Sequence, residues 1–306
     1  MRKIFSIFIF CFTIAISSFS QNADSLFSSA FSKYQKGDYQ GSVSDYTLLI
    51  KLKPENINAY LNRAIAYDCI HEYKKALSDI NHVILKQPDA DIYMNRGKVY
   101  EHLRKYNEAI ADYSKAIELS SGQLLNYYNR ANAYYESGKY HLALSDLNII
   151  IQTYPKFSLA YYKMGMVYDA MLELDSAIQV YTLSIQLDST KIETFLNRGF
   201  DYKELNRDLS ALIDFSFVIK IDSTYSDAYF NRALIYDEHE NYEKAISDYT
   251  HVIKLEPFAS DAYYNRALAK AALGRHSESC RDMMEAAELG DKSAHKYYKQ
   301  NCLKKY

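Results

Sequence analysis

The sequence contains no tryptophan, and it is poor in turn-forming residues, with 9 glycines and 4 prolines among 306 residues. So few of these residues argue against an all-β chain, which needs many tight turns. The composition is that of a globular protein, with 48% hydrophobic and 24% charged residues, and no long tract must be disordered. Tyrosine, in contrast, occurs 31 times. The length allows two ordinary domains or one repeat array.

Motifs for catalysis and for metal binding are also lacking. The eight histidines are dispersed, and none forms an HExxH or another tight metal-ligand spacing. There is no glycine-rich phosphate loop, and no serine or cysteine lies in a nucleophile motif. We therefore expect a protein that is not an enzyme and that has no catalytic residues, no cofactor and no metal site.

The N-terminus has the pattern of a secretory signal peptide over residues 1–20. Arg2 and Lys3 precede an apolar run, small residues follow it, and cleavage is expected between Ser20 and Gln21. The alternative is an uncleaved anchor, but the run is shorter than the roughly 20 apolar residues that span a bilayer. Cys11 lacks the small residue before it that a lipoprotein cleavage site requires. We expect export to the periplasm or cell envelope of a bacterial-type cell, with no membrane span after cleavage.

The charge of the mature chain disfavours nucleic acid as a partner. Removing Arg2 and Lys3 with the signal leaves 34 basic against 38 acidic residues, a net charge of −4. Binding to nucleic acid depends on neutralising phosphates with basic side chains. Export also makes disulfide bonds permissible.

A phrase of the form Tyr-x-Asn-Arg-(Ala/Gly) recurs along the chain, 34 residues apart except for one spacing of 33. It begins at Tyr60, Tyr93, Tyr127, Tyr229 and Tyr263, with Phe195 and a degenerate copy at Tyr161. A fixed period of this length indicates a repeat array. We expect eight repeats over residues 21–293, at about 23–56, 57–89, 90–123, 124–157, 158–191, 192–225, 226–259 and 260–293.

Each repeat has the pattern of two amphipathic helices. In the second repeat, Tyr60, Ala64 and Tyr67 form one apolar stripe, and Ala76 and Ile80 belong to the next. Glycine marks the turn between the helices in three copies, and a proline closes four of the repeats. We expect residues 294–306 to form a C-terminal capping helix.

The period and these residues resemble the tetratricopeptide-repeat (TPR) family, over essentially all of the mature chain. Numbering each repeat from its first residue, the family pattern at positions 4, 8, 11, 20, 24 and 32 is met by Tyr60, Ala64, Tyr67, Ala76, Ile80 and Pro88. The resemblance implies an all-α fold, a right-handed α-solenoid of about eight helix hairpins with a C-terminal solvating helix. It also implies that the first helices line a concave groove.

The two end repeats depart from the pattern. Ser42 and Ser279 replace the alanine at position 20, and Lys33 and Lys270 replace the tyrosine at position 11. Terminal repeats need a polar outer face, and we interpret these substitutions as such caps.

Arginine at position 7 and aspartate at position 23 lie level across the hairpin turn and are predicted to pair. In the fifth repeat both are lost together, as Met164 and Val180. Stranding one charge of a partly buried pair costs on the order of 3–5 kcal/mol, whereas replacing both can be neutral. The joint loss therefore indicates a structural role. The pairs are Arg63 with Asp79, Arg96 with Asp112, Arg130 with Asp146, Arg198 with Asp214, Arg232 with Asp248 and Arg266 with Asp282, and Ser29 faces Asp45 in the first repeat.

The asparagine at position 6 has no partner that changes with it. The resemblance places this position in the groove, where the amide can hold a peptide backbone through its donor and acceptor together. The alternative is a hydrogen bond to the neighbouring repeat. The asparagines are Asn62, Asn95, Asn129, Asn197, Asn231 and Asn265.

Other positions on the first helices complete the predicted groove. Position 5 is apolar or aromatic throughout, and acids gather at positions 2, 12 and 13. An apolar floor with acidic edges suits a peptide that is apolar and neutral-to-basic, although positions 5 and 9 also pack between repeats. The candidate ligand-binding residues besides the asparagines are Tyr128, Tyr162, Phe230, Tyr264, Lys98 and Lys163.

Two cysteines near the C-terminus are candidates for a disulfide. Cys280 lies ten residues before Gly290 and Cys302 twelve after it, so antiparallel helices would place them opposite each other. Such a hairpin can supply the Cα separation of about 4.4–6.8 Å that a disulfide needs. Cys69 is left over, either buried or as a free thiol.

These features predict a protein–protein interaction scaffold, with a peptide segment of a partner bound in the groove. Two alternatives remain: a glycan-associated envelope factor that stacks sugars on its tyrosines, and a non-catalytic subunit of an enzyme complex. The sequence names neither the partner nor the oligomeric state.

Overall fold

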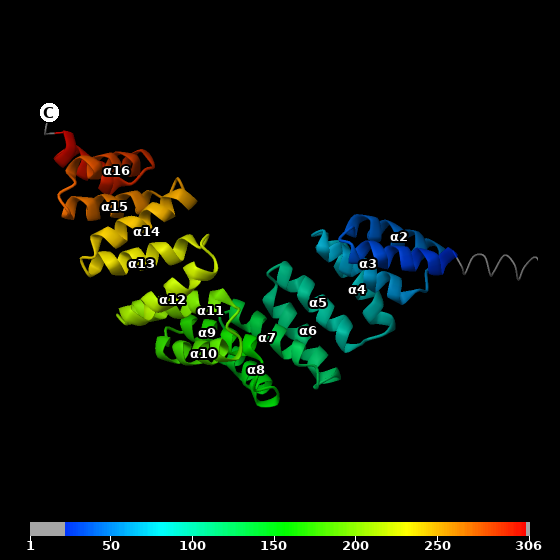
Figure 1. Cartoon of the computed structure of the whole chain (residues 1–306). Coiled ribbons are helices and arrows are strands. Elements are labelled where there is room, and N and C mark those ends of the chain that lie inside the picture. Colours follow the sequence, from blue (N-terminus) through cyan, green and yellow to red (C-terminus); the bar gives the residue numbers. More distant parts are fainter. Residues whose placement is uncertain (1–21, 304–306) are drawn as a thin grey trace, which may run out of the picture. The chain divides into compact units, whose positions relative to one another are not determined.

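The computed structural model describes residues 22–303, and the predicted signal peptide lies outside them. The described residues are helical with no strands, which confirms the prediction of an all-α chain of helix hairpins. The chain divides into two compact units, an N-terminal unit up to Thr153 and a C-terminal unit from Tyr154. Each unit consists of successive helix hairpins (Figure 1).

The N-terminal unit holds four hairpins, and the first begins with a helix over residues 22–35. The other helices of this unit are α2 (Tyr39–Leu52), α3 (Ile57–Cys69), α4 (Tyr73–Lys86), α5 (Ala90–His102), α6 (Tyr106–Leu119), α7 (Leu124–Glu136) and α8 (Tyr140–Thr153).

The C-terminal unit holds four more hairpins and a terminal segment. Its helices are α9 (Ser158–Ala170), α10 (Leu174–Leu187), α11 (Ile192–Glu204), α12 (Asp208–Ile221), α13 (Ser226–Glu238), α14 (Tyr242–Leu255), α15 (Ser260–Ala272), α16 (His276–Glu288), α17 (Lys292–Tyr297) and the π-helix η1 (Tyr298–Cys302). The last helix therefore begins at Lys292, two residues before the predicted start, and changes to a π-helix at Tyr298.

The turn inside every hairpin uses the left-handed backbone region at position 15. Glycine occupies it in three repeats, with a positive φ at Gly37, Gly138 and Gly274. The other five repeats place a residue with a side chain there, at His71, Arg104, Leu172, Asn206 and Glu240. A Cβ in this region crowds the following carbonyl oxygen. These turns therefore keep their shape at an energetic cost that glycine would avoid.

Small residues bring the two helices of each hairpin together. Positions 8 and 20 face each other and are fully buried in pairs such as Ala64 and Ala76 of the second repeat and Ala233 and Ala245 of the seventh. Isoleucine, tyrosine, phenylalanine or methionine at position 24 fills the space beside them, and neighbouring repeats share these clusters. The core of each unit is thus a row of hydrophobic clusters between successive helices.

The end repeats correct one expectation from the sequence. Ser42 and Ser279 are buried rather than solvent-facing, and Lys270 is 9% exposed. The Lys270 ammonium lies 2.8 Å from an Asp282 carboxylate oxygen, and Lys33 lies 2.7 Å from Asp45. Both lysines therefore neutralise the aspartate at position 23, Lys270 from a buried position and Lys33 with 38% of its side chain exposed.

The aspartates at position 23 are the buried partners of the predicted ion pairs. Asp79, Asp112 and Asp248 are 7%, 5% and 4% exposed. The same burial holds for Asp146, Asp214 and Asp282. The physical reason is that position 23 lies between the two helices of its hairpin, where the arginine at position 7 covers it. Asp79, Asp112 and Asp248 therefore belong to the core and offer no surface to a ligand.

Candidate functional site

First helices of neighbouring repeats contact each other. In the N-terminal unit α3 contacts α5 and α5 contacts α7, and in the C-terminal unit α11 contacts α13. In each unit these helices form a surface, and we use the name A-face for the surface of the first helices in either unit. The predicted ligand-binding residues all belong to these first helices: Asn62, Asn95, Lys98, Tyr128 and Asn129 in the N-terminal unit, and Tyr162, Lys163, Asn197, Phe230, Asn231, Tyr264 and Asn265 in the C-terminal unit. All are partly buried except Asn129, which is buried.

The arginine of each repeat that has one makes a two-pronged ion pair with the aspartate of its own hairpin. In Arg130, Nε and Nη2 donate to the two carboxylate oxygens of Asp146 at 2.8 and 2.7 Å. Fork-to-fork pairs of this kind are strong and directional. The same geometry joins Arg63 to Asp79, Arg96 to Asp112, Arg198 to Asp214, Arg232 to Asp248 and Arg266 to Asp282.

Both oxygens of each of these carboxylates are thus engaged below the surface. The carboxylates of Asp79, Asp112 and Asp248 are buried deeper than the paired guanidinium groups, whose side chains keep 14%, 21% and 17% exposure. At Asp214, burial raises the pKa of the carboxyl group against the opposing effect of Arg198. The predicted structural aspartates are therefore part of the packed hairpin and not of the A-face.

The same arginines also connect neighbouring repeats. Nη1 of Arg130 donates to the hydroxyl of Ser114, at position 25 of the preceding repeat, at 3.0 Å. Each of the other five arginines has a hydroxyl or amide partner at that position. The rings of Tyr127 and Tyr134 lie 5.7 Å from the Arg130 guanidinium, within the range of cation–π attraction. The guanidinium is fully used inside the scaffold, so its role is structural.

The asparagines at position 6 differ from one another. Nδ2 of Asn95 and of Asn231 donates to a carbonyl one turn earlier in the same helix, whereas Asn197 donates to the Tyr181 hydroxyl of the preceding repeat at 3.5 Å. Nδ2 of Asn129 is buried and has no hydrogen-bond partner. Oδ1 of Asn132, one turn further along α7, is likewise buried without a partner. The bond to the neighbouring repeat thus occurs at Asn197, while Asn129 has unused donor capacity.

A tyrosine at position 24 recurs in every second repeat and faces an acid at position 12. The Tyr113 hydroxyl donates to Glu101, and the Tyr181 hydroxyl donates to Asp169 at 2.9 Å. In the seventh repeat, the Tyr249 hydroxyl and Oδ1 of Asp237 are both buried without a partner. Asn197 extends the second of these pairs to a hydrogen-bonded triad, and Asn129 and Asn265 occupy the corresponding sequence position after the other two pairs. We call the three sets triads: Glu101–Tyr113–Asn129, Asp169–Tyr181–Asn197 and Asp237–Tyr249–Asn265.

The triads lie in an environment with little water. The three tyrosine rings have no exposed surface, and burial raises the pKa of each of their hydroxyl groups. Burial also raises the pKa of the Glu101 and Asp237 carboxyl groups. Each triad is therefore a polar group set into an apolar wall, where a hydrogen bond or a charge counts for more than in water.

Two glycines at position 8 make room for the tyrosine rings of the first and second triads. A Cβ on Gly165 would come within 2.2 Å of the Tyr181 ring, and a Cβ on Gly97 within 2.7 Å of the Tyr113 ring. Glycine at position 8 therefore makes room for the ring at position 24 in the third and fifth repeats, whereas the seventh repeat has Ala233 beside Tyr249. Position 5 adds a second ring, since Tyr162 lies 6.0 Å from Tyr181.

One residue breaks the repeat pattern beside the second triad. Position 10 is small or aliphatic and buried in six other repeats, as Ala66, Val99, Ala133, Val167, Ile235 and Ala269. In the sixth repeat it is Asp201, which is only 3% exposed and whose Oδ2 has no hydrogen-bond donor. Burial and the adjacent Asp169 raise the pKa of Asp201 to about 9. At neutral pH Asp201 therefore keeps a proton that it can donate to Asp169.

Sequence reasoning missed the triads and Asp201. It treated positions 12 and 24 as separate features of a 34-residue period, whereas the triads repeat every 68 residues, as Glu101, Asp169 and Asp237 do. An alternation of tyrosine with Ile80, Leu147 and other apolar residues at position 24 was the available signal. The single aspartate at the apolar position 10 was the signal for Asp201.

Two predicted residues have partners within the chain. The Lys191 ammonium lies 3.6 Å from the centre of the Tyr162 ring, and burial lowers the pKa of Lys191. Phe230 meets the Tyr249 ring edge-on at 5.8 Å. These rings line the A-face beside the second and third triads.

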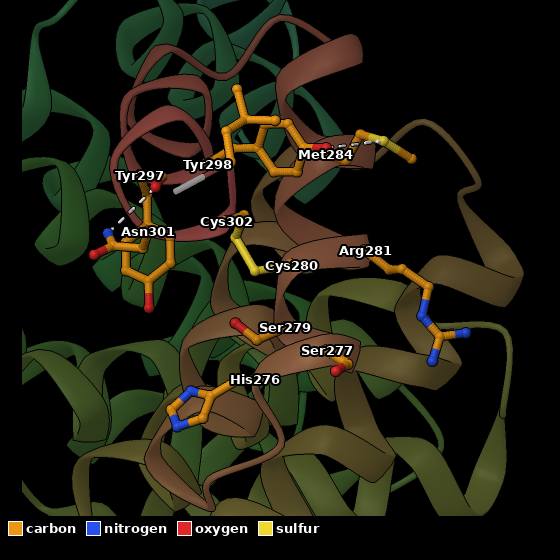
Figure 2. A pocket seen from close by; sticks show the side chains of 11 residues that line it. His276, Ser277, Ser279, Cys280, Arg281, Met284, Tyr297, Tyr298, Asn301 and Cys302 are labelled. Carbon is orange, nitrogen blue, oxygen red and sulfur yellow. Dashed lines mark hydrogen bonds between the residues drawn. A yellow bond between two sulfur atoms is a disulfide. The ribbon is translucent and has the colours of Figure 1, made fainter. Parts of the chain in front are cut away.

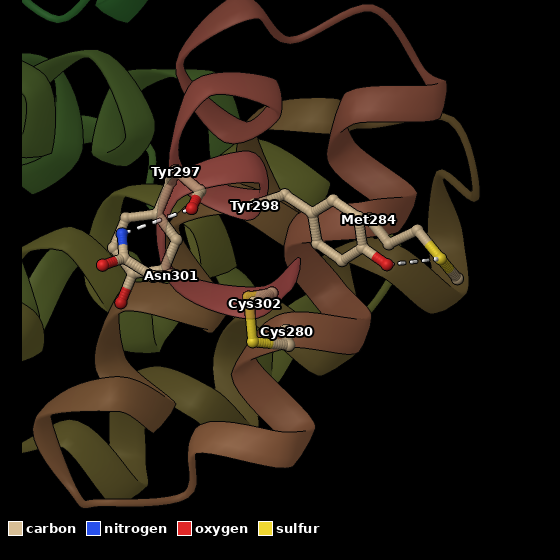
Figure 3. The surroundings of a disulfide bond; sticks show 6 residues. All are labelled: Cys280, Met284, Tyr297, Tyr298, Asn301 and Cys302. Carbon is tan, nitrogen blue, oxygen red and sulfur yellow. Dashed lines mark hydrogen bonds between the residues drawn. A yellow bond between two sulfur atoms is a disulfide. The ribbon is translucent and has the colours of Figure 1, made fainter. Parts of the chain in front are cut away.

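The C-terminal end carries a separate cleft. It has a volume of about 620 Å³ and lies between α16 and the α17–η1 segment (Figure 2). Its wall includes the Cys280–Cys302 disulfide, whose Cα atoms are 5.7 Å apart, and Figure 3 shows the bond joining α16 to η1. The Tyr298 hydroxyl donates to Met284 Sδ at 3.7 Å. Cys69 is free and half-buried, and its thiol donates to the Tyr34 hydroxyl.

Neither a metal-binding cluster nor a membrane-spanning helix is found in residues 22–303. No cluster of three or more histidine, cysteine, aspartate or glutamate side chains there could hold a metal ion. Within the same residues, no helix combines the length and apolarity needed to cross a bilayer.

Comparison with known protein families identifies the repeats. Models of the tetratricopeptide repeat match residues 90–122, 126–156, 159–191, 226–258 and 260–289. The chain belongs to the tetratricopeptide-repeat family. Repeats 23–56, 57–89 and 192–225 lie outside the matched ranges but have the same hairpin. TPR proteins generally serve as non-catalytic scaffolds for interactions between proteins. No curated protein matches the chain.

Solved structures show the same fold at low sequence identity. The C-terminal part of a TPR repeat-containing protein from Cytophaga hutchinsonii aligns with a TM-score of 0.65 and 18% identity, covering 78% of this chain and 98% of that one. PilW, described as a widely conserved type IV pilus biogenesis factor, aligns with a TM-score of 0.60 and 18% identity, covering 67% and 96%. MamA from Desulfovibrio magneticus RS-1, residues 41 to the end, gives 0.52 and 20%, covering 56% and 97%.

Proposed function

We propose that this TPR protein is a scaffold whose A-face binds an extended or helical peptide segment of a partner protein. The observation that carries the proposal is the set of buried polar atoms without partners. Among the described residues, six such atoms belong to first helices, on Asn126, Asn129, Asn132, Thr194, Asp201 and Asp237. Buried polar groups are nearly always hydrogen-bonded in folded proteins. Of these side chains Asn132 and Asp237 are half-buried, and a peptide backbone, with its regular donors and acceptors, can supply the missing partners once they rotate toward the surface.

The chemistry of the A-face favours a peptide that is apolar and neutral-to-basic. Half-buried rings, including Tyr128, Phe230 and Tyr264, offer apolar surface, and the acids of the triads lie between them. An acidic peptide would place like charges together in a low-dielectric site, which costs several kcal/mol.

The burial of the triad tyrosines removes three rings from those on which a sugar could stack. A sugar stacks on an exposed ring face, and the rings of Tyr113, Tyr181 and Tyr249 have no exposed surface. Their hydroxyl groups, in contrast, lie beside acids on the A-face. We therefore propose a peptide and not a sugar as the ligand.

We further propose that the chain works in the periplasm or cell envelope, on the basis of the signal-peptide pattern in residues 1–20. A fusion of residues 1–25 to alkaline phosphatase, which is active only after export, should give active enzyme. The mature chain should begin at Gln21 by mass spectrometry. An inactive fusion, or a chain that retains Met1, would contradict this location.

The binding proposal is tested by peptide selection. A displayed library of random dodecapeptides is selected on the mature chain, and the affinities of enriched peptides are measured by fluorescence polarisation. Removing two A-face amides with Asn197→Ala and Asn265→Ala should weaken binding about thirtyfold, since each lost hydrogen bond contributes about 1 kcal/mol. The control is Leu209→Ser, at a side chain 79% exposed on the second helix α12. Peptides that lose affinity only with the control variant would refute the A-face as the site.

A further inference from the structure

A buried aspartate occupies a position at which the fold does not require a polar side chain. Six other repeats place alanine, valine or isoleucine where the sixth has Asp201. The hairpin geometry is the same in all of them, so packing alone is satisfied by an apolar side chain. Burying a carboxyl group without its full set of partners costs free energy. Asp201 therefore reduces stability, and a function has to account for it.

Asp169 lies between the buried Asp201 and the surface of the A-face. Asp201 is 3% exposed, whereas Asp169, on the neighbouring first helix α9, is half-buried and lies on the A-face. The Tyr181 hydroxyl donates to Asp169 at 2.9 Å, and Asn197 donates to that hydroxyl at 3.5 Å. The tyrosine and the asparagine thus hold the Asp169 carboxylate in place. No N–H or O–H group among the described residues donates to Oδ2 of Asp201, and its carboxyl group shares a proton with Asp169.

Two carboxyl groups that share one proton are complementary to a cation that carries several N–H donors, because the cation can replace that proton. A lysine ammonium has three donors and an arginine guanidinium has five. Charge-assisted hydrogen bonds to a carboxylate are about twice as strong as neutral ones. The apolar wall formed by Tyr181 and Tyr162 raises the value of such a bond further.

The charged groups nearby leave this pair of carboxyl groups available. The Lys191 ammonium lies over the Tyr162 ring, and no ion pair joins it to Asp169 or Asp201 among the described residues. Glu204, on the same helix as Asp201, adds negative charge and raises the pKa of Asp201 together with Asp169. A basic side chain is therefore the group that this position lacks.

From this geometry we infer that Asp169, Asp201, Tyr181 and Asn197 form a subsite of the A-face for a lysine or arginine side chain of the bound peptide. The inference rests on the proposed function, since it names the chemistry of one residue of that peptide. The first and third triads lack a second buried acid at position 10, where they have Ala133 and Ala269 in the following repeat. The cation is thus bound at one place along the peptide, which fixes its register.

The test compares peptides that differ in one charge. Pools of fluorescein-labelled decapeptides carry Lys, Arg, norleucine or Gln at the sixth position and random residues elsewhere, and binding is measured by fluorescence polarisation. Norleucine has the length of lysine without the ammonium. Wild type should prefer the Lys and Arg pools over norleucine by about tenfold. Asp201→Val, which reproduces the residue at Val167, should reduce this preference to within about twofold.

Two further variants separate the causes. Glu256→Gln removes an exposed carboxylate on the segment after α14 and should keep the wild-type preference, which excludes a long-range effect of net charge. Asp201→Asn keeps the shape of the side chain and should lose the preference for the Lys and Arg pools over norleucine. If the valine variant fails to fold, the asparagine variant tests the role of the carboxyl group instead. Equal binding of the Lys and norleucine pools to wild type overturns this subsite alone. Binding of no pool to wild type overturns the proposed function as well.

Discussion

At the scale of residues, the arginine at position 7 contributes to the fold through three kinds of partner at once. Arg130 binds both oxygens of Asp146, donates to Ser114 of the preceding repeat and lies between two tyrosine rings. A guanidinium can satisfy all of these because its donors have a fixed fork geometry. The fifth repeat, which lacks the pair, replaces it with the apolar Met164 and Val180.

The first prediction concerns this pair. Arg130→Ala should destabilise the protein by about 3–5 kcal/mol, because it leaves the buried Asp146 carboxylate without a counter-charge. The double variant Arg130→Met and Asp146→Val copies the fifth repeat and should lose much less. Thermal unfolding followed by circular dichroism measures both. Equal losses in the two variants would show that the ion pair is not the source of the stability.

The second prediction concerns Asp201 and pH. Its pKa is about 9 in the folded protein, against about 3.9 for an ordinary aspartate. Between these values the folded state holds a proton that the unfolded state releases, so wild-type stability falls as pH rises from about 4 to 9. Asp201→Val lacks this penalty.

The free energy of unfolding of Asp201→Val should therefore exceed that of wild type by a margin that widens with pH. We expect up to about 1 kcal/mol per pH unit, below the one-proton slope of about 1.4 because Asp169 shares the proton. Urea denaturation at pH 5, 6.5 and 8 measures the margin, with Glu256→Gln as a control that should show none. A constant margin would mean that Asp201 is ionised in the folded state.

At the scale of elements, each hairpin depends on a turn with one left-handed residue. Leu172 adopts a φ of 60° at that position and is 84% exposed, so its side chain gains little from packing. Glycine has no Cβ to crowd the carbonyl.

The third prediction is that Leu172→Gly stabilises the protein by about 0.5–1 kcal/mol, the conformational cost of roughly 1–2 less the extra entropy of glycine in the unfolded chain. The reverse change, Gly274→Leu, at a φ of 75°, should destabilise by a similar amount. Urea denaturation measures both variants. A loss of stability in Leu172→Gly would show that this side chain contributes packing that outweighs the strain.

The fourth prediction concerns the C-terminal segment. The disulfide closes a loop with a sequence separation of 22 residues and joins α16 to η1. Cys280→Ser with Cys302→Ser should speed amide hydrogen exchange in α17 and η1, because closing such a loop stabilises by about 3 kcal/mol. Exchange in α9 to α14 should not change, since repeats contact only their neighbours. Cys69→Ser is the control, and unchanged exchange in α17 would refute this role.

At the scale of the whole molecule, the repeat period made the fold readable from the sequence. Eight copies of one pattern average out the exceptions in any single copy, so the hairpins and the partners of the six Arg–Asp pairs follow from spacing. The depth of the pairs does not follow from spacing. Asp79, Asp112 and Asp248 are buried, because the arginine and the packed hairpin cover them together.

The other differences between sequence and structure also arise from contacts between helices. The end repeats were misread because Lys270 looks solvated in sequence, whereas in the structure it neutralises a buried aspartate. The triads were not predicted from the sequence, because their members lie in three helices and recur only in every second repeat. A period of 34 residues does not contain that information.

The central claim is that the A-face amides bind the partner's peptide. The most direct test is an NMR titration of the mature chain, labelled with ¹⁵N only in asparagine, with a peptide selected on it. The side-chain NH₂ signals of Asn129, Asn197 and Asn265 should shift with the bound fraction. Those of Asn107 and Asn148, exposed on the second helices α6 and α8, should stay in place. Shifts at Asn107 or Asn148 with none at the three triad asparagines would contradict the account.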